Sequence, residues 1–270
     1  MAGMSHHPAD KYHAGEHHAG EHRADEQGWS ARHGGLAPSA PVRLWLRGVQ
    51  RLAATGPVAR VPPDVLSAAG VLALVTAVAT AARWPLLAAV LVVLAGVLDG
   101  LDGAVALHTG RARPLGAVVD ALADRVGDLL LAALLAVLGA PAGWCVAVAA
   151  LTLLHEYVRA RAMAEGMPGV GAVTAAERPT RLILVAVAAL GTAVAPGGTP
   201  WTGWGWATVC AVGWVVVGVI GFVHLAIAVV RTIPRRFPGP QAGPTSSATI
   251  AADSATIGNP PPGCADPPTR

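Results

Sequence analysis

Hydrophobic residues gather along the chain into six long runs, separated by short segments that contain polar residues, glycine or proline. The runs cover residues 65–83, 85–107, 116–139, 143–163, 180–196 and 205–230. Each run approaches the ~20 apolar residues that an α-helix needs to cross the ~30 Å hydrocarbon layer of a bilayer. The pattern predicts an all-α integral membrane protein with six transmembrane helices.

The segments before and after these runs have different patterns. In residues 42–53, arginine alternates with Leu, Trp and Val at helical spacing, which predicts a juxtamembrane amphipathic helix on the membrane surface. Residues 1–40 hold seven of the ten histidines, and residues 232–270 are rich in Pro, Ser and Thr. Neither composition can bury an apolar core. We therefore expect two disordered cytoplasmic tails around a membrane domain of residues 42–231, and the His-rich tail leaves weak metal binding open.

Arginine and tryptophan mark opposite sets of connecting segments. Arginines precede the first run, follow the last, and occupy every second connection between them, whereas the other connections hold only Arg83 among the basic residues. Those other connections carry Trp84, Trp144, Trp201, Trp204 and Trp206. Positive residues stay on the cytoplasmic side and tryptophans collect at the membrane interface. This asymmetry predicts a multi-pass protein of the cell membrane with both termini in the cytoplasm.

Composition agrees with a membrane protein and argues against several other classes. Only 13% of the 270 residues are charged, 53% are hydrophobic, and the mean hydropathy is +0.52. An ordinary soluble domain has about 25% charged residues. The net charge of +3 does not indicate nucleic-acid binding, because the arginines flank apolar runs. The three cysteines form no Cys-x-x-Cys pair, which argues against a disulfide framework or a thiolate metal site.

Aspartates interrupt the apolar pattern at the cytoplasmic end of the second and third runs. Asp99 and Asp102 are three residues apart and Asp120 and Asp124 are four apart, so each pair shares one face of a helix. A short connection predicts that the two helices form an antiparallel hairpin in which the pairs face each other. Asp128 has no matched partner, and a helix-packing role is open for it.

Carboxylates this close need a cation between them, because like charges oppose each other's ionisation. Ligands that are all oxygen atoms favour Mg²⁺ or Mn²⁺ over zinc, and four aspartates could hold two ions that bridge phosphate oxygens. Gly100, Gly103 and Gly116 lie beside the aspartates, where missing side chains would let a bulky ligand approach the backbone. The cluster predicts a site for a phosphate-bearing ligand.

The segment from residue 99 to residue 124 resembles the signature of the CDP-alcohol phosphatidyltransferase family. The matching positions are Asp99, Asp102, Gly103, Ala106, Gly116, Asp120 and Asp124. The six-helix layout extends the resemblance to about residues 42–231. One position departs from the pattern, since Leu107 stands where the family usually has arginine, and Arg111 one turn later could supply that charge.

The resemblance implies an enzyme of phospholipid biosynthesis at the cytoplasmic face of the membrane. Such an enzyme passes the phosphatidyl group of CDP-diacylglycerol to the hydroxyl of an alcohol, releases CMP, and forms a homodimer. Two Mg²⁺ or Mn²⁺ ions would be held by Asp99, Asp102, Asp120 and Asp124, with Asp124 as the general base. The nucleotide site would comprise Asp99, Asp102, Gly103, Ala106, Arg111 and Gly116.

Four arginines on the same side suggest the class of acceptor. Arg159, Arg161, Arg178 and Arg181 flank the fourth connection, and arginine binds phosphate through two parallel hydrogen bonds. They favour an anionic acceptor such as inositol phosphate or glycerol phosphate, although the positive-inside rule alone would also place arginines there. The surrounding sequence is similar to segments of actinobacterial phosphatidylinositol phosphate synthases.

Two other hypotheses follow from the same residues. Membrane aspartates and a His-rich tail would suit a divalent-metal transporter, but a transport path needs polar residues near the bilayer midplane. The motif aspartates instead lie toward one face. A catalytically inactive membrane scaffold is the other alternative, and Leu107 is the feature that suggests it.

Overall fold

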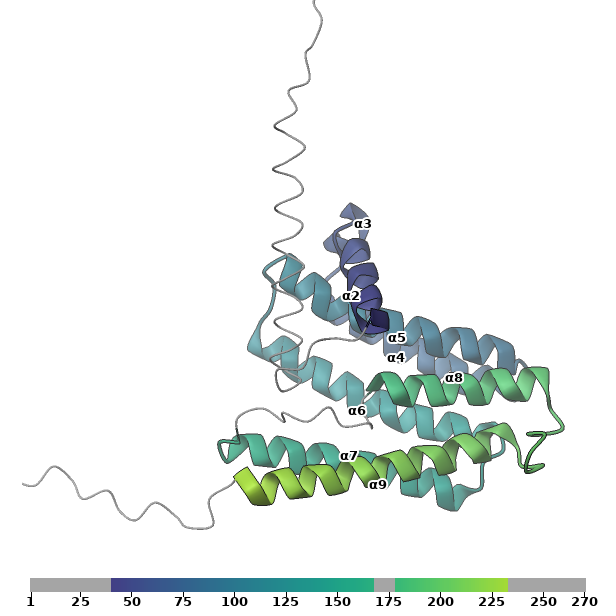
Figure 1. Ribbon diagram of the computed structural model, residues 1–270. Coiled ribbons are helices and arrows are strands. Elements are labelled where there is room, and N and C mark those ends of the chain that lie inside the picture. The colour runs from purple at the N-terminus through teal and green to yellow at the C-terminus, as the bar shows by residue number, and fades with distance from the viewer. Residues whose placement is uncertain (1–39, 168–177, 233–270) are drawn as a thin grey trace, which may run out of the picture. The chain divides into compact units, whose positions relative to one another are not determined.

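The computed structural model describes residues 40–167 and 178–232, and this part of the chain is helical with no strand (Figure 1). The predicted tails of residues 1–40 and 232–270 lie outside the described residues, except for Ala40 and Thr232. The described residues form eight helices, in order α2 (Ala40–Ala53), α3 (Gly56–Arg60), α4 (Pro63–Thr80), α5 (Pro85–His108), α6 (Pro114–Val137), α7 (Ala142–Ala164), α8 (Arg178–Val194) and α9 (Trp206–Thr232). The all-α prediction is confirmed for the described part.

Proline and glycine set many of the helix boundaries. Pro63, Pro85 and Pro114 each begin a long helix, where proline's fixed φ suits the first turn and its missing N–H costs no hydrogen bond. Gly110 and Gly139 follow α5 and α6 with φ of 64° and 100°, a left-handed conformation that glycine adopts without penalty. These residues divide the apolar sequence into helices of membrane-spanning length.

Six long helices, α4 to α9, coincide with the six predicted runs. Three of them, α4, α5 and α9, are long and apolar enough to cross a membrane. The other three carry more charge, with Asp120 to Asp128 in α6, Glu156 to Arg161 in α7, and two arginines in the first turn of the 17-residue α8. The chain is thus an all-α membrane protein, and spans by α6, α7 and α8 stay a prediction.

Both neighbouring and distant helices of the chain pack against each other. Both α4 and α8 pack against α5 and also against α6, while α7 packs mainly against α9 (Figure 1). Contact between α5 and α6 is slight by comparison. The predicted α5–α6 hairpin is therefore wrong as a packed pair, because α4 and α8 lie against both helices. The aspartates of α5 and α6 meet across this arrangement.

Small side chains let the helices approach closely. Ala77 of α4, Ala88 of α5 and Ala188 of α8 are fully buried within one apolar cluster, which also contains Trp214 of α9. Interfaces between membrane helices favour such small residues because packing, not water exclusion, drives association in lipid. The cluster holds together the helices that carry the site.

The amphipathic segment before the first run forms helix α2, as predicted. Val49 and Ala53 on one side of α2 are buried in a second apolar cluster with Leu101 and Val105 of α5. The helix is thereby attached next to the aspartates of α5. Its position on a membrane surface stays a prediction.

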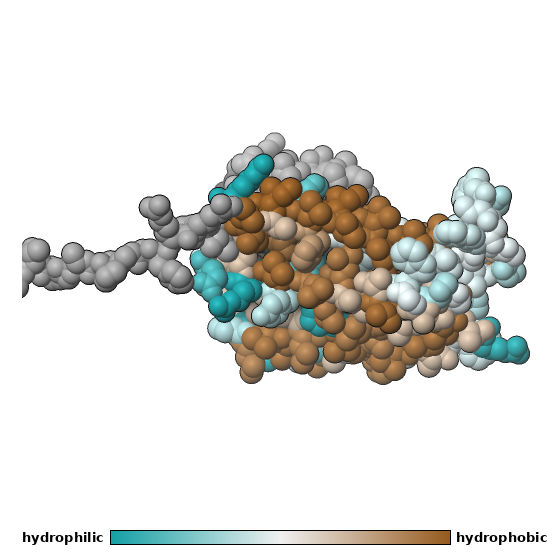
Figure 2. Space-filling view, turned by 90° about the horizontal axis from the view of Figure 1, so that it is seen from below, coloured by the Kyte–Doolittle hydropathy of each residue, from teal (hydrophilic) through white to brown (hydrophobic). Residues whose placement is uncertain are grey.

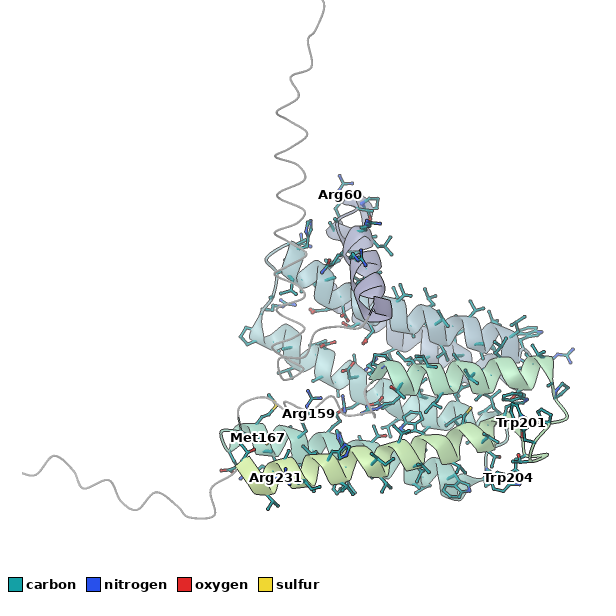
Figure 3. All side chains as sticks on the ribbon, in the orientation of Figure 1. Arg60, Arg159, Met167, Trp201, Trp204 and Arg231 are labelled. Carbon is teal, nitrogen blue, oxygen red and sulfur yellow. The ribbon has the colours of Figure 1, made fainter. Side chains whose placement is uncertain are left out.

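Hydrophobic residues cover much of the face shown in Figure 2, and hydrophilic ones gather toward its two ends. Trp201 and Trp204 are 81% and 53% exposed and lie at one end, whereas Arg231 lies at the other (Figure 3). A surface of this kind suits lipid around its middle and water at both ends. The arrangement agrees with the predicted separation of arginine and tryptophan.

Candidate functional site

Three of the four motif aspartates converge in the structure. Asp99 of α5 and Asp120 and Asp124 of α6 each offer a carboxylate oxygen, and these three atoms lie within 4.8 Å of one another. We call these residues the carboxylate trio. The spacing of four residues in α6 aligns Asp120 and Asp124 on one face, as the sequence predicts. The sequence predicted that aspartates of these two helices would face each other, and Asp99 does lie close to Asp120 and Asp124.

Asp102 is close in sequence but has different partners. It is only 5% exposed, and its carboxylate accepts a hydrogen bond of 2.5 Å from the Ser67 hydroxyl of α4 and one of 2.6 Å from the Gly103 N–H. These contacts fix the orientation of the carboxylate. Ser67 was not predicted from the sequence, because nothing in the local pattern of α4 shows that its hydroxyl reaches α5.

Arg178, the first residue of α8, reaches into the trio. Its Nη2 lies 3.0 Å from Oδ1 of Asp99, and its Nη1 donates to Oδ1 of Asp124. The side chain is 18% exposed. The guanidinium thus joins carboxylates that come from α5 and α6, the two helices that make little direct contact.

A network of buried charges lies next to the trio. Arg181 of α8 is 3% exposed, donates to Asp128 of α6 over 2.7 Å and to Glu156 of α7 over 3.1 Å. Arg125 lies 3.6 Å from Asp124, 3.6 Å from Asp128 and 3.4 Å from Glu156. The network links the faces of α6, α7 and α8. The sequence analysis missed Arg125, whose charge within an apolar run was the available signal.

Arg159 and Arg161, which were also predicted to bind the acceptor, pair with glutamates and not with the trio. Arg159 is 40% exposed and lies 3.9 Å from Glu156, whereas Arg161 is 67% exposed and pairs with Glu165 at 2.6 Å. Of the four arginines, Arg178 contacts the trio, and Arg181 and Arg159 are joined to it through the network. Arg161 is placed on the surface with its own carboxylate partner.

The predicted nucleotide-binding residues surround an accessible end of α5. A Cβ added at Gly103 would meet no atom within 4 Å, so there is open space beside the backbone. Ala106 is half-buried, Arg111 is exposed in the connection after α5, and Leu107 is 63% exposed. Gly116 is more enclosed, since an added Cβ would lie 3.3 Å from the Arg113 side chain, which pairs with Asp64.

The donor set of the trio fits a hard divalent cation. Ions such as Mg²⁺ take carboxylate oxygens at ~2.0–2.1 Å in octahedral geometry, which places neighbouring ligand oxygens about 3 Å apart and opposite ones about 4 Å apart. Three oxygens within 4.8 Å of one another need only small side-chain movements to satisfy it. The described residues place no cysteine or histidine in this set, which matches the preference of magnesium and manganese for oxygen.

A comparison with protein-family models settles the family. The model that describes CDP-alcohol phosphatidyltransferases matches residues 60–220, which include α4 to α8, the trio, Asp102 and most of α9. The chain belongs to the CDP-alcohol phosphatidyltransferase family. The family assigned from the aspartate pattern is therefore confirmed, and with it a relationship to transferases of phospholipid biosynthesis.

Curated relatives within this family act in inositol lipid synthesis, as their names state. The phosphatidylinositol phosphate synthase of Mycolicibacterium smegmatis is 35% identical over 138 residues, which cover 47% of this chain and 60% of that protein. The archaetidylinositol phosphate synthase of Aeropyrum pernix is 33% identical over 103 residues, covering 37% of this chain and 53% of that protein. The chain thus matches little more than half the length of these relatives.

A solved structure of the family has a similar fold. The crystal structure of the phosphatidylinositol phosphate synthase of Mycobacterium tuberculosis with CDP-DAG bound has a TM-score of 0.52 and 25% sequence identity to this chain. The similarity covers 69% of this chain and 94% of that one. The helical arrangement described above is thus shared with a CDP-alcohol phosphatidyltransferase.

Proposed function

We propose that this chain transfers the phosphatidyl group of CDP-diacylglycerol to the hydroxyl of an alcohol and releases CMP. The observation that carries the proposal is the convergence of Asp99, Asp120 and Asp124 from two helices at the family's sequence signature. In this reaction the acceptor oxygen forms a bond to the phosphorus that carries diacylglycerol. The bond from that phosphorus to the CMP oxygen breaks, and CMP leaves with the electron pair.

The motif aspartates have distinct parts in the proposed site. Asp99, Asp102, Asp120 and Asp124 would hold two Mg²⁺ or Mn²⁺ ions, which when bound supply positive charge for the diphosphate and the leaving CMP. Asp124 would act as the general base and accept the proton of the acceptor hydroxyl. The Ser67 and Gly103 hydrogen bonds hold the Asp102 carboxylate in one orientation.

The nucleotide would bind beside the C-terminal half of α5. Open space at Gly103 and the half-buried Ala106 would admit the diphosphate close to the backbone, and Gly116 would be a further part of the site. Arg111 would supply the guanidinium that most members have at the position of Leu107. Asp99 and Asp102 would contribute to this site through the ions that they hold.

For the acceptor, we propose an anionic alcohol, with inositol phosphate favoured and glycerol phosphate as the second candidate. The names of the relatives support inositol phosphate. Phosphate recognition would fall to Arg159, Arg161, Arg178 and Arg181, since guanidinium groups bind phosphate in a bidentate manner. Arg178 is the best supported of these, because it already lies at the trio.

The reaction also suggests how the chain is placed in the cell. The acyl chains of the donor remain in lipid, so we propose six membrane-spanning helices with the aspartates and both termini on the cytoplasmic side of the cell membrane. A homodimer is part of the same proposal. In it, residues 42–231 form the catalytic domain, and residues 1–40 and 232–270 are tails without catalytic residues.

CMP release by the purified protein tests the proposal. The protein is given CDP-diacylglycerol and Mg²⁺ or Mn²⁺, with inositol phosphate, glycerol phosphate, inositol or serine as separate acceptors. Release of CMP with inositol phosphate, lost on chelation and in Asp124→Asn, is the expected result. Protein that binds CDP-diacylglycerol but releases CMP with none of the four acceptors would contradict the proposed acceptor class. Protein that fails to bind the donor would contradict the reaction itself and favour the scaffold or the transporter.

A further inference from the structure

Arg178 connects two members of the carboxylate trio that belong to different helices. One nitrogen of its guanidinium lies 3.0 Å from Asp99 of α5, and the other donates to Asp124 of α6. The side chains of Arg178, Asp99 and Asp124 are 18%, 27% and 23% exposed, so water screens these charges only in part. A positive group thus occupies the place where α5 and α6 bring their carboxylates together.

The position of this guanidinium depends on a glycine of α6. A Cβ added at Gly127 would lie 3.2 Å from Nη2 of Arg178 and 3.3 Å from Cδ1 of Leu74. Both distances are shorter than ordinary van der Waals contact, so a side chain at residue 127 would push the guanidinium. Gly127 comes three residues after Asp124, one turn along the same face. The missing side chain at Gly127 therefore leaves the space in which the Arg178 guanidinium lies next to the trio.

A divalent ion and this guanidinium need the same carboxylates. Asp99 and Asp124 belong both to the trio and to the Arg178 ion pairs. A positive charge a few ångströms from a cation opposes its binding, and a partly buried setting strengthens the effect. Arg178 also removes part of the negative charge that would attract the ion. The two cations therefore oppose each other at one site.

We propose that Arg178 is a tethered counter-cation that competes with the divalent ion for Asp99 and Asp124. The arginine holds the carboxylates together, and ion binding displaces it from them. The displaced guanidinium then lies beside the site, available to an anionic substrate. This last consequence rests on the proposed function, whereas the competition for the carboxylates does not.

Binding of Mn²⁺ to the purified full-length protein in detergent, followed by electron paramagnetic resonance without any substrate, tests the competition. Arg178→Gln should bind Mn²⁺ at least about tenfold more tightly than the wild type, because the opposing charge is gone. Arg113→Gln is the matched control, since it removes a guanidinium that pairs with Asp64 outside the trio. Its Mn²⁺ affinity should stay within about twofold of the wild type. Unchanged or weaker Mn²⁺ binding in Arg178→Gln would overturn the inference.

A second variant separates the position of the guanidinium from its charge. Gly127→Ala keeps Arg178 but places a methyl group against its Nη2. It should tighten Mn²⁺ binding by a smaller factor than Arg178→Gln does. Mn²⁺ binding that is unchanged in Gly127→Ala would show that Gly127 does not determine the position of the guanidinium.

Thermal unfolding provides a readout that also shows whether the variants fold. Without divalent ions, Arg178→Gln should melt at a lower temperature than the wild type, because the carboxylates then repel one another. Added Mn²⁺ should raise its melting temperature by more than it raises that of the wild type, as expected for an ion that binds the folded state more tightly. An equal rise in both proteins would count against competition.

The experiments distinguish failure of this inference from failure of the proposed function. Tighter Mn²⁺ binding in Arg178→Gln, together with no CMP release by the wild type under any condition, would support the competition and contradict the reaction. CMP release by the wild type with unchanged Mn²⁺ binding in Arg178→Gln would support the reaction and contradict the competition. If neither protein binds Mn²⁺, both the competition and the ion site of the proposed function are wrong.

Discussion

Asp102 differs from the other motif aspartates in how its carboxylate is held. Both of its oxygens accept hydrogen bonds, one from Ser67 and one from the Gly103 N–H, and the residue is buried. A buried acceptor that loses its donor pays the cost of desolvation without compensation. Ser67 is therefore a positioning residue for Asp102, on a helix outside the family signature of residues 99–124.

Replacement of Ser67 by alanine should lower both stability and activity. The lost hydrogen bond to a charged, buried acceptor should destabilise the fold by about 1–3 kcal/mol, and an Asp102 carboxylate held only by the Gly103 N–H should reduce CMP release. Thermal unfolding and initial rates measure the two effects. Ser67→Thr keeps the hydroxyl and is the control, with rates expected near those of the wild type. A wild-type rate in Ser67→Ala would remove the positioning role.

Leu107 stands where the family usually has arginine, and this leads to a prediction about Arg111. Arg111→Gln should raise the KM for CDP-diacylglycerol by roughly tenfold with a smaller change in kcat, because a charge-assisted contact to the diphosphate is lost. Leu107 is exposed, so an arginine there can be added without disturbing the core. Leu107→Arg in the Arg111→Gln background should restore the KM. A KM that does not respond to Arg111→Gln would show that Arg111 is not the substitute.

At the scale of elements, buried charges tie α6, α7 and α8 together. Arg181 is joined to Asp128 of α6 and Glu156 of α7, and Arg125 approaches the same two carboxylates. A balanced buried network costs little when complete, but removing one partner leaves a charge uncompensated. The network thus fixes how α8 sits against α6, and with it the position of Arg178.

Replacement of Arg181 by methionine should strongly destabilise the protein. The buried Asp128 and the partly buried Glu156 would lose Arg181, the arginine closest to each, and share only the more distant Arg125, at a cost of about 3–5 kcal/mol. Thermal unfolding in detergent measures the change. Arg161→Gln is the matched control, because Arg161 makes an exposed pair with Glu165 that contributes at most about 1 kcal/mol. Equal melting temperatures for the two variants would contradict this account of the network.

Close packing of α8 on the start of α9 gives another prediction. A Cβ added at Gly191 would overlap the rigid indole ring of Trp206, whereas one added at Gly143 of α7 would meet no atom within 4 Å. Gly191→Ala should therefore lower the melting temperature through overpacking, at a cost of about 1–3 kcal/mol. Gly143→Ala should leave the melting temperature nearly unchanged or raise it slightly, since alanine favours helix. Equal effects of the two changes would be inconsistent with the contact at Gly191.

For the whole molecule, the sequence predicted well whatever depends on local pattern. The apolar runs gave the six long helices, and the spacing of Asp120 and Asp124 placed both on one face. It failed where helices from distant parts of the chain meet. Nothing local indicates that α4 and α8 pack on both α5 and α6, that Ser67 reaches Asp102, or that Arg178 reaches the trio. Such contacts depend on the complementary shapes of several helices.

The predicted orientation of the whole molecule can be tested with single cysteines. Cys145 and Cys210 are free and buried, so a Cys264→Ser background should react little with a membrane-impermeant maleimide.

Pro200→Cys lies in the exposed connection between α8 and α9, beside Trp201 and Trp204, and should be labelled in intact cells. Glu165→Cys lies just after α7 on the arginine side and should be labelled only after the membrane is permeabilised. The charge asymmetry requires this result, because translocating the arginine-bearing connections would oppose the positive-inside rule. The reverse labelling pattern would place the carboxylate trio on the outer face, away from cytoplasmic CDP-linked substrates, and would contradict the proposed reaction as well as the topology.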